Sequence, residues 1–363
     1  MRFLVINGPN LNLLGSREPE VYGTTTLADL EDLISTWARE LEVRVETAQT
    51  NSESRIIELI HSFDGDGIVL NPGAFTHNSR AIADAISGVG APVVEVHISN
   101  IRSREPWRAQ SMMAPVAELS IYGRGVGGYR NALRHLVNRA AGPFETIRYG
   151  PHEDNVGDLR RGGQDLVVLA HGGVWKHEFG RDLTESLAVD LTRRGYSTWN
   201  IEYRRLGVGG GWPGSGHDVL TALDSLPLEL DLRRLILVGH SAGSYLLMWA
   251  AARSRVEADL HIALGPLLDL ETAVESSDVG AEQCRSMLEH GAPALLDPGG
   301  IETVIVHGDG DEIVPVERSV AFSERHGLEH HRTPCDHFSL LDPDKPEWSW
   351  AIERIGSGHR LSG

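Results

Sequence analysis

The sequence predicts an α/β protein with two parallel-sheet domains, and three observations support this fold class. The chain has 363 residues, a length typical of two domains. Short apolar runs alternate with amphipathic stretches in both halves, as expected for parallel strands connected by helices. The helical pattern of the first half stops at 140–143, Ala-Ala-Gly-Pro, a helix-ending signal. We therefore expect a first domain over 1–141, a linker and lead-in over 142–165, and a second domain over 166–363.

Each element of the first half follows from a local pattern. Strands are expected where apolar residues run together, and helices where they recur every three or four residues. Thr26 followed by Asp29 is a capping signal for the first helix. Five strands within about 140 residues suit a flavodoxin-like five-stranded parallel sheet. The expected strands are 2–6, 42–47, 67–71, 93–98 and 118–122, and the expected helices lie near 26–40, 53–62, 77–87 and 127–140.

The second half repeats the alternation but not the sequence. Its loop motifs differ completely from those of the first half, so the two halves are not internal repeats. The segment 142–165 is rich in Gly, Asp, Glu and Arg, and it either links the halves or forms short lead-in strands. The expected strands lie near 166–170, 197–202, 234–239, 259–264, 302–307 and 328–333.

Composition and charge exclude several function classes. A formal net charge of −18 gives no field that attracts nucleic acid or an anionic membrane. The longest apolar run, 245–252, is too short to cross a bilayer. Only two cysteines are present, Cys284 and Cys335, which argues against a disulfide scaffold and favours a cytoplasmic location. The first 141 residues contain no lysine, which excludes Schiff-base chemistry in that half.

The unusual polar residues of the first half follow the ends of three expected strands. They lie in NGPNLNLLGSREPEVYG (7–23), NPGAFTHNS (71–79) and EVHISN (95–100), the last followed by Arg104 and Arg108. Ligands bind at the carboxyl ends of parallel strands, so these segments should form one pocket. The pocket would suit an anion, and it has no metal-ligand spacing, so we expect no metal in it.

Two pairs of residues in these segments suggest acid–base chemistry. Arg17 lies five residues before Tyr22, and a nearby guanidinium favours the phenolate form that can act as a base. Glu95 and His97 point the same way on a regular strand, and the carboxylate would keep the imidazole protonated as a general acid. Each residue alone could be an ordinary core tyrosine or strand-end histidine. Together they suit elimination of water from a small hydroxy acid.

The run Gly-Arg-Gly-Val-Gly-Gly at 123–128 fits a dinucleotide-binding pattern by its spacing. Such a site needs a further parallel strand and an acidic residue about twenty positions on, whereas here the helix runs into the Gly-Pro boundary. We interpret the glycines as a tight turn with close helix packing.

These motifs resemble the type II 3-dehydroquinate dehydratase family over the whole of 1–141. The resemblance implies cofactor-free dehydration of 3-dehydroquinate to 3-dehydroshikimate through an enolate, as part of the shikimate or quinate pathway. By it, Tyr22 removes the C2 proton, Arg17 stabilises the anionic transition state, and Asn10 supports the enolate. It also implies that His97, oriented by Glu95, protonates the departing hydroxyl. Substrate-binding positions are implied for Asn71, His77, Asp84 (reaching a neighbouring subunit), Ile98, Ser99 and Arg108. The family forms a dodecamer of trimers, so a homo-oligomer is implied, with a dodecamer as one form.

The second half contains the signature of a serine hydrolase. Residues 239–243 read Gly-His-Ser-Ala-Gly between an expected strand and helix, the context of a nucleophile elbow at Ser241. Upstream, residues 171–175 read His-Gly-Gly-Val-Trp, and the backbone N–H groups of Gly172 and Gly173 would form an oxyanion hole with that of Ala242.

An acid and a histidine follow in the order that the nucleophile elbow requires. Asp311 is our candidate acid, Asp309 is the alternative, and His337 is the candidate base. A chance match in a glycine-rich chain is the competing interpretation, and the ordered set of four motifs argues against it. Other histidines, such as His330 and His331, are expected on the surface, and Cys335 is expected to pack rather than react.

This half resembles the α/β-hydrolase esterases over about 144–355, particularly kynurenine formamidase and HGG-type carboxylesterases, through HGGVW and DHFSLLDP. The substrate would be an ester or amide, chosen by loops such as 204–216 and 265–300. We therefore expect a dehydratase fused to a serine hydrolase, both acting on small molecules. The alternatives are that one half is catalytically silent, or that the first half binds a flavin or nucleotide. Release of quinate from an ester would connect the two activities.

Overall fold

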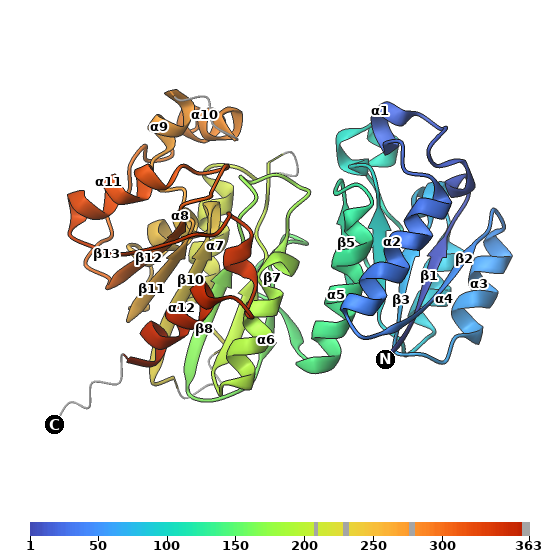
Figure 1. The fold of residues 1–363 in the computed structure, drawn as a ribbon, viewed down its shortest axis with the longest axis horizontal. Coiled ribbons are helices and arrows are strands. Elements are labelled where there is room, and N and C mark those ends of the chain that lie inside the picture. The colour runs from blue at the N-terminus through green and yellow to red at the C-terminus, as the bar shows by residue number, and fades with distance from the viewer. Residues whose placement is uncertain (207–209, 228–231, 276–279, 358–363) are drawn as a thin grey trace. The chain divides into compact units, whose positions relative to one another are not determined.

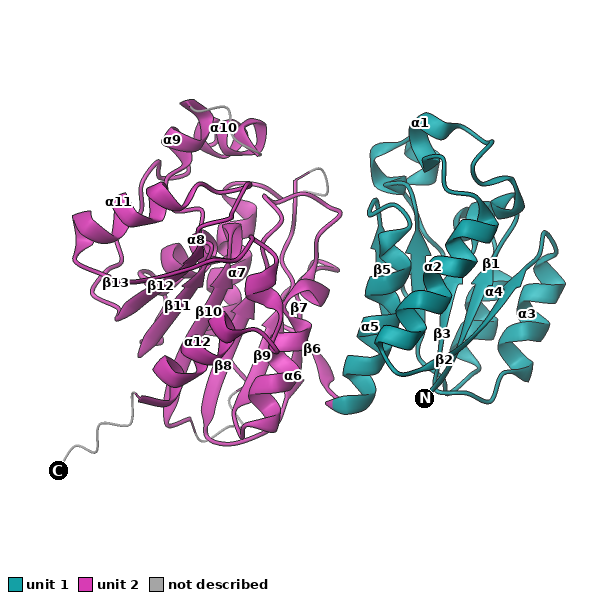
Figure 2. Cartoon of the chain, viewed as in Figure 1, with its two compact units in different colours: residues 1–141 teal, residues 142–363 magenta. Residues whose placement is uncertain are grey.

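The structure is a computed structural model, and it describes residues 1–206, 210–227, 232–275 and 280–357. The chain separates into two compact units, residues 1–141 and 142–363 (Figure 2). Each unit has its own sheet and its own hydrophobic cores. None of the described helices is long and apolar enough to span a bilayer.

The first unit is built on a five-stranded sheet in the order β2-β1-β3-β4-β5, with every pair parallel (Figure 1). This order and class confirm the predicted flavodoxin-like fold. The register places Asn7 opposite Asn71, so the loops after β1 and β3 start side by side. The strands are β1 (Arg2–Asn7), β2 (Arg44–Gln49), β3 (Gly67–Asn71), β4 (Val93–His97) and β5 (Leu119–Tyr122).

Helices cover both faces of this sheet and form two apolar cores. The first core holds Leu30 and Ile34 with Leu133 and Leu136, and the second holds Ile56 and other residues of the opposite face. Thr26 caps its helix as predicted, since its hydroxyl accepts from the Asp29 N–H and the Asp29 carboxylate accepts in return. The helices are α1 (Pro19–Tyr22), α2 (Leu27–Glu40), α3 (Glu53–Ser62), α4 (Arg80–Ser87) and α5 (Gly127–Ala141).

The second unit has an eight-stranded sheet in the order β13-β12-β11-β10-β8-β9-β7-β6. Its first two strands lie in the segment that was expected to be a linker or lead-in, and they join the sheet in antiparallel fashion. The other strands are parallel. The strands are β6 (Glu145–Arg148), β7 (Val156–Arg160), β8 (Asp165–Ala170), β9 (Ser197–Ile201), β10 (Arg234–His240), β11 (Leu260–Leu264), β12 (Thr303–Gly308) and β13 (Glu329–Thr333).

The second sheet is also covered on both faces. One core includes Tyr245 and Trp175, and the other includes Leu187 and Trp348. The described helices are α6 (Glu185–Arg193), α7 (Gly214–Asp224), α8 (Ala242–Ala251), α9 (Leu270–Glu275), α10 (Ala281–Glu289), α11 (Val316–His326) and α12 (Pro346–Ser357).

The expected elements agree with the structure to within three residues, with two corrections. Residues 73–77 form a 3₁₀ turn, so the helix predicted from residue 77 begins at Arg80, where Ser79 caps it. The four-residue helix α1 was not predicted, because a single turn has no apolar periodicity to detect. The turn at 123–128 holds the end of β4 through hydrogen bonds from the N–H groups of Gly123 and Gly125 to His97 and Ile98.

Candidate active sites

The carboxyl edge of the first sheet gathers the predicted polar segments. Tyr22 is the last residue of α1, and its side chain is half-buried. Arg104 Nη1 donates a hydrogen bond of 2.8 Å to the Tyr22 hydroxyl. The Arg17 guanidinium lies over the same ring, with its carbon 5.2 Å from the ring centroid. Two cations therefore face the phenol of Tyr22.

His97 and Glu95 form the predicted pair. His97 Nε2 lies 2.8 Å from Glu95 Oε1, and both side chains are buried. Both residues lie on β4, two positions apart, so they share one face of the strand.

Three hydroxyl groups surround the Glu95 carboxylate. Thr76 donates at 2.5 Å, Ser120 at 2.7 Å and Ser111 at 2.8 Å. Burial by itself opposes ionisation, but the hydrogen bond and charge attraction of His97, together with the hydroxyls of Thr76 and Ser120, lower the Glu95 pKa to about 2. Glu95 is therefore a fixed anion that orients the His97 ring.

A buried chain of hydrogen bonds orients Asn71. Asn71 Oδ1 accepts from the Gly73 N–H at 3.2 Å, so its Nδ2 must face Tyr129, to whose hydroxyl it donates at 2.9 Å. Tyr129 in turn donates to Asn7 Oδ1 at 2.6 Å. Burial raises the Tyr129 pKa, which keeps its hydroxyl protonated as a donor.

A cavity of about 540 Å³ lies beside Tyr22. It is lined by the segment from Val21 to Gly23, by Ile98 and Ser99, by Arg104 and by the glycine turn after β5. Of the six predicted substrate-binding residues, Ile98 and Ser99 line this cavity, whereas Asn71, His77, Asp84 and Arg108 do not.

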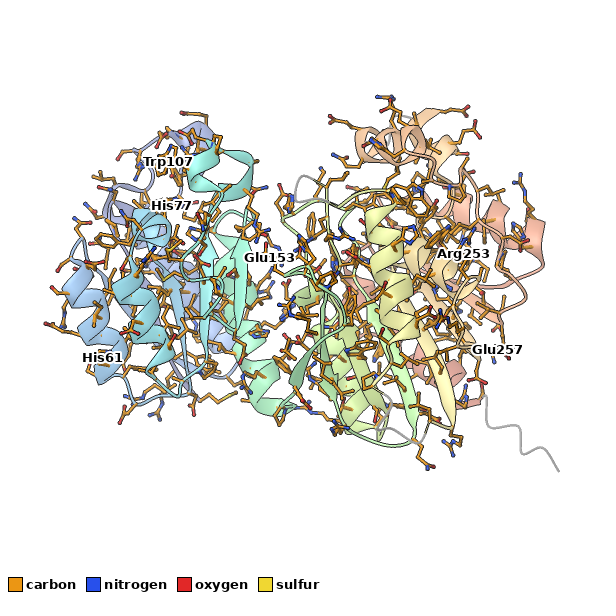
Figure 3. The ribbon with its side chains drawn as sticks, turned by 180° about the vertical axis from the view of Figure 1, so that it is seen from behind. His61, His77, Trp107, Glu153, Arg253 and Glu257 are labelled. Atoms are coloured by element: carbon orange, nitrogen blue, oxygen red, sulfur yellow. The ribbon has the colours of Figure 1, made fainter. Side chains whose placement is uncertain are left out.

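The remaining predicted residues of this site lie on other segments of the first unit. Asn10 is exposed, has a left-handed backbone (φ 66°), and its N–H donates to Asn51 Oδ1 at 2.9 Å. His77 Nδ1 lies 2.9 Å from the Gln110 carbonyl, and burial lowers the His77 pKa. Its ring packs edge-on against Trp107, which is 58% exposed (Figure 3). Arg108 lies 2.9 Å from the Glu105 carboxylate, and Asp84 is exposed on α4.

In the second unit, Ser241 occupies a strained turn between β10 and α8. Its φ of 53° and ψ of −122° are unusual for a residue with a side chain. Glycines on both sides permit this turn: a Cβ on Gly239 would lie 2.5 Å from Ser244 Cα, and one on Gly243 would lie 2.2 Å from the Ala170 carbonyl oxygen. This is the backbone that a nucleophile elbow requires.

His337 and Asp311 form a close pair near the elbow. His337 Nδ1 lies 2.6 Å from Asp311 Oδ2, and both residues are buried. The His240 ring, next to Ser241 in the chain, lies 4.6 Å from the His337 ring. Asp309, the alternative acid, is exposed and pairs with Arg332 at 2.6 Å. The geometry therefore pairs Asp311, and not Asp309, with His337.

Backbone N–H groups fix the other side of the Asp311 carboxylate. Asp311 Oδ1 accepts from the N–H groups of Ile313 and Val314, each at 2.9 Å. Burial opposes ionisation of Asp311, but hydrogen bonds from His307, His337 and Val314 outweigh it and lower the Asp311 pKa well below its ordinary value.

The predicted oxyanion segment lies against the nucleophile. A Cβ on Gly172 would be 2.7 Å from Ser241 Cβ, so only a glycine fits there. Gly173 has a φ of 104°, and Ala242 is the first residue of α8. His171 anchors the segment, since its Nε2 lies 2.8 Å from Glu202 Oε1 and its ring stacks on Tyr203.

The predicted specificity loops fall partly outside the described residues, and the predicted surface position of two histidines is wrong. Parts of both expected specificity loops, residues 207–209 and 276–279, lie outside the described residues, as does the end of the predicted domain at 358–363. His330 was expected on the surface, but it is half-buried and its Nε2 lies 2.8 Å from Ser319 Oγ. His331, also expected on the surface, is likewise half-buried, and its ring is stacked on Trp350.

Sequence reasoning missed several residues that contact the predicted ones. Arg104 was recognised only as a nearby arginine, and no signal in the sequence connects it with Tyr22. The hydroxyls around Glu95 and the phenol of Tyr129 come from other strands, turns and helices, so only the fold brings them together. His307, which also contacts Asp311, lies at the end of a predicted strand, and that position is the one available signal.

Residues 1–137 match the family described as Dehydroquinase class II. A 3-dehydroquinate dehydratase from Anoxybacillus flavithermus is 51% identical over 144 residues, covering 39% of this chain and 97% of the relative. Catabolic 3-dehydroquinase 1 from Neosartorya fischeri is 53% identical over 136 residues, covering 37% of this chain and 91% of the relative.

The second unit has more distant relatives. Residues 158–282 match the family described as BD-FAE. The crystal structure of esterase B from Lactobacillus rhamnosis, inhibited by a tributyrin phosphonate, is 17% identical and covers 63% of this chain and 90% of that chain, with a TM-score of 0.52. This likeness shows that the second unit has the fold of that esterase.

Proposed function

Because the chain belongs through residues 1–141 to the type II dehydroquinase family, we propose that Tyr22 and His97 are the base and acid that convert 3-dehydroquinate to 3-dehydroshikimate. Two observations together carry this assignment. Two arginines face the phenol of Tyr22, and the buried carboxylate of Glu95 contacts the His97 imidazole. A general base and a general acid are the two groups that elimination of water requires.

In the first step, the Tyr22 phenolate takes the proton from C2 of the substrate. The electron pair of the broken C–H bond moves onto the carbonyl oxygen, which gives an enolate. Arg17 and Arg104 stabilise the negative charge as it passes from the phenolate to the substrate. Asn10 is assigned to the enolate oxygen, in keeping with its left-handed backbone and exposed side chain.

In the second step, the enolate reforms the ketone and its electron pair expels the hydroxyl from C1. His97 donates the proton that turns the departing hydroxyl into water, and Glu95 stabilises the imidazolium before this transfer. A proton then returns from Tyr22 to His97 through solvent, which restores both groups. A positioned acid and a positioned base each contribute about 10²–10⁴ to the rate.

Substrate binding is assigned to groups that can neutralise and orient a small hydroxylated carboxylate. The Ile98 and Ser99 backbone and the Asn71 amide would hold the carboxylate, and His77 and Arg108 would contact hydroxyl groups. Asp84 is exposed on α4, as it must be to reach the site of a neighbouring subunit. We therefore propose a homo-oligomer, with a dodecamer as one form.

The second unit is proposed to be a serine hydrolase of esters or amides. His337 removes the Ser241 proton, and the serine oxygen attacks the substrate carbonyl to form a tetrahedral oxyanion. The oxyanion lies among the N–H groups of Gly172, Gly173 and Ala242. His337 gives its proton to the leaving alcohol or amine, and water then releases the acid from Ser241 by the same route. The strained backbone at Ser241 and the 2.6 Å His337–Asp311 contact support this assignment.

A cytoplasmic location is part of the proposal. Both cysteines, Cys284 and Cys335, are buried, and neither forms a disulfide within the described residues. Burial raises the Cys335 pKa to about 12, which keeps this thiol protonated and unreactive beside the hydrolase site.

Two assays test the proposed function. The purified chain should convert 3-dehydroquinate to 3-dehydroshikimate, seen as a rise in ultraviolet absorbance, without added metal or cofactor. A fluorophosphonate should label Ser241, and a panel of an aryl ester, N-formylkynurenine and a quinate ester identifies the substrate class. Failure to dehydrate, or failure to label Ser241, would each remove one half of the proposal independently of the other.

A further inference from the structure

The catalytic carboxylate of the second unit is contacted by two histidines rather than one. His337 Nδ1 lies 2.6 Å from Asp311 Oδ2, and His307 Nε2 lies 3.1 Å from the same oxygen. A serine hydrolase needs only the first of these contacts. His307 is the fifth residue of β12 and its side chain is fully buried, so the contact is built into the sheet.

The protonation of the His307 Nε2 atom follows from its neighbours. Nε2 lies within hydrogen-bond distance of two oxygens, Asp311 Oδ2 at 3.1 Å and the Val314 carbonyl at 2.9 Å. An ionised carboxylate and a backbone carbonyl can only accept, so Nε2 must carry a proton and donate it. His307 therefore gives Asp311 a further N–H donor, beside the two backbone N–H groups and His337.

The other ring nitrogen of His307, Nδ1, contacts a second set of polar side chains. His307 Nδ1 lies 2.7 Å from Ser319 Oγ, and that oxygen lies 2.8 Å from His330 Nε2. Burial, followed by the charge of His307, lowers the His330 pKa to about 4, so His330 is neutral at pH 7. The Ser319 hydroxyl also donates to the Val316 carbonyl oxygen at 2.9 Å, so its single proton is directed at that carbonyl. Ser319, which contacts both Val316 and His330, thus holds the His307 ring in place at Nδ1.

We propose that His307 is a positioning residue for the hydrolase: it holds Asp311 Oδ2 and shares its negative charge with His337, while Ser319 and His330 hold its ring in place. The inference rests on the proposed hydrolase function. Without His307, the Asp311 carboxylate would direct its charge at His337 alone and would stabilise the His337 imidazolium. His337 would then become the free base only at a higher pH. The Asp311 carboxylate would also lose one of the donors that fix its orientation.

Other charged groups face this network. His240 and Asp336 interact electrostatically with Asp311, and His330 is faced by Arg332, His331 and Asp309. None of them takes the place of His307, because within the described residues only His307 and His337 donate a side-chain hydrogen bond to Asp311.

Three variants separate positioning from packing. His307→Leu fills the space without a donor, and His307→Gln supplies an amide N–H in its place. His261→Leu is the matched control: His261 is a fully buried histidine on the neighbouring strand β11, and its Nε2 has no hydrogen-bond partner among the described residues. A general effect of losing a buried histidine should appear in the control as well.

The readout is kcat/KM for p-nitrophenyl acetate, and the rate of Ser241 labelling by a fluorophosphonate, from pH 5 to 9. His307→Leu should lower both rates by about tenfold to a hundredfold, as expected for a lost hydrogen bond to a charged group, and should move the acid limb to higher pH. His307→Gln should recover most of the rate. An unshifted pH profile in His307→Leu, or an equal loss in His261→Leu, would overturn the inference.

Proton NMR of the full chain supplies a readout that does not depend on activity. The downfield imidazole N–H signals should include one from His307 and one from His337, and His307→Leu should remove the first and shift the second. A wild-type protein could show both signals but neither hydrolyse esters nor react with the fluorophosphonate at Ser241. That result would refute the proposed function and leave the His307–Asp311 contact confirmed. A His337 signal unmoved by His307→Leu would refute the inference itself.

Discussion

Arg104 Nη1 donates a 2.8 Å hydrogen bond to the hydroxyl of Tyr22, a residue 82 positions away in the sequence. Sequence spacing had drawn attention to Arg17, which instead lies over the face of the Tyr22 ring, 5.2 Å from its centroid. The two arginines therefore have different roles: Arg104 binds the oxygen that would carry the charge, and Arg17 supplies a positive field across the ring.

Replacing Arg104 should therefore slow dehydration, because Tyr22, the proposed base, loses its hydrogen-bond donor. We expect Arg104→Met to lower kcat by about 10²-fold, since one preorganised donor to a charged oxygen is lost. Arg104→Lys should recover part of the rate, because an ammonium group keeps the charge but not the planar geometry. The matched control is Arg39→Met, which removes an exposed arginine on α2. Steady-state kinetics that show equal rates for Arg104→Met and the control would contradict the role of Arg104.

The Glu95 carboxylate should contribute stability that depends on pH in a defined direction. Its pKa of about 2 lies below the ordinary value of 4.5, so the contribution is complete above about pH 4.5 and is lost as pH falls towards 2. The difference corresponds to about 3 kcal/mol.

The measurement compares wild type with Glu95→Gln. The readout is the temperature at which dehydratase activity is irreversibly lost after heating at each pH between 2.5 and 7, assayed at pH 7. The gap between the two proteins should be largest near neutral pH and should narrow as pH falls below about 4.5. A gap that stays constant over this range would show that Glu95 is not held as an anion.

The hydroxyl of Tyr129 should affect substrate binding because it orients the Asn71 amide. Tyr129→Phe keeps the ring in the core but frees the Asn71 amide to rotate, so KM for 3-dehydroquinate should rise by about tenfold while kcat changes little. Ile34→Val, in the same apolar core, controls for general destabilisation. Asn71→Ala combined with Tyr129→Phe should be no worse than Asn71→Ala alone. Additive effects would place Tyr129 outside the binding of the substrate.

The identity of the acid in the second unit can be settled with two substitutions that change the same chemistry at neighbouring positions. Asp311→Asn should lower the hydrolysis rate by about 10⁴-fold, because the imidazole loses its orienting anion. Asp309→Asn should change it by less than about threefold, since Asp309 makes only an exposed ion pair with Arg332. Initial rates with an aryl ester distinguish the two, and a larger effect at Asp309 would reverse the assignment.

The sequence is sufficient to predict the fold because both sheets follow from local patterns. Buried strands such as β3 and β8 appear as short apolar runs, and each ends at a glycine- or proline-containing turn. The candidate catalytic residues were equally visible, since Tyr22, His97, Ser241 and His337 all lie in segments with unusual polar composition. Strand ends and motifs are properties of contiguous sequence, which explains why they could be located in advance.

The supporting contacts could not be predicted for a physical reason. Arg104 and Tyr129 act through hydrogen bonds to residues that are far away in sequence. His307 contacts Asp311 through the turn that follows β12. Their partners are fixed by the crossing of loops over the sheet edge, which no local periodicity encodes. The choice between Asp309 and Asp311 likewise depends on which carboxylate turns inward after β12, a two-residue difference that only the backbone decides.

The central claim is that one chain carries two chemically independent active sites, and a single paired experiment tests it most directly. Wild type, Tyr22→Phe and Ser241→Ala are assayed side by side for ultraviolet detection of 3-dehydroshikimate and for aryl ester hydrolysis. We predict that Tyr22→Phe loses only the dehydration and that Ser241→Ala loses only the hydrolysis. Dehydration that survives in Tyr22→Phe, or hydrolysis that survives in Ser241→Ala, would contradict the account.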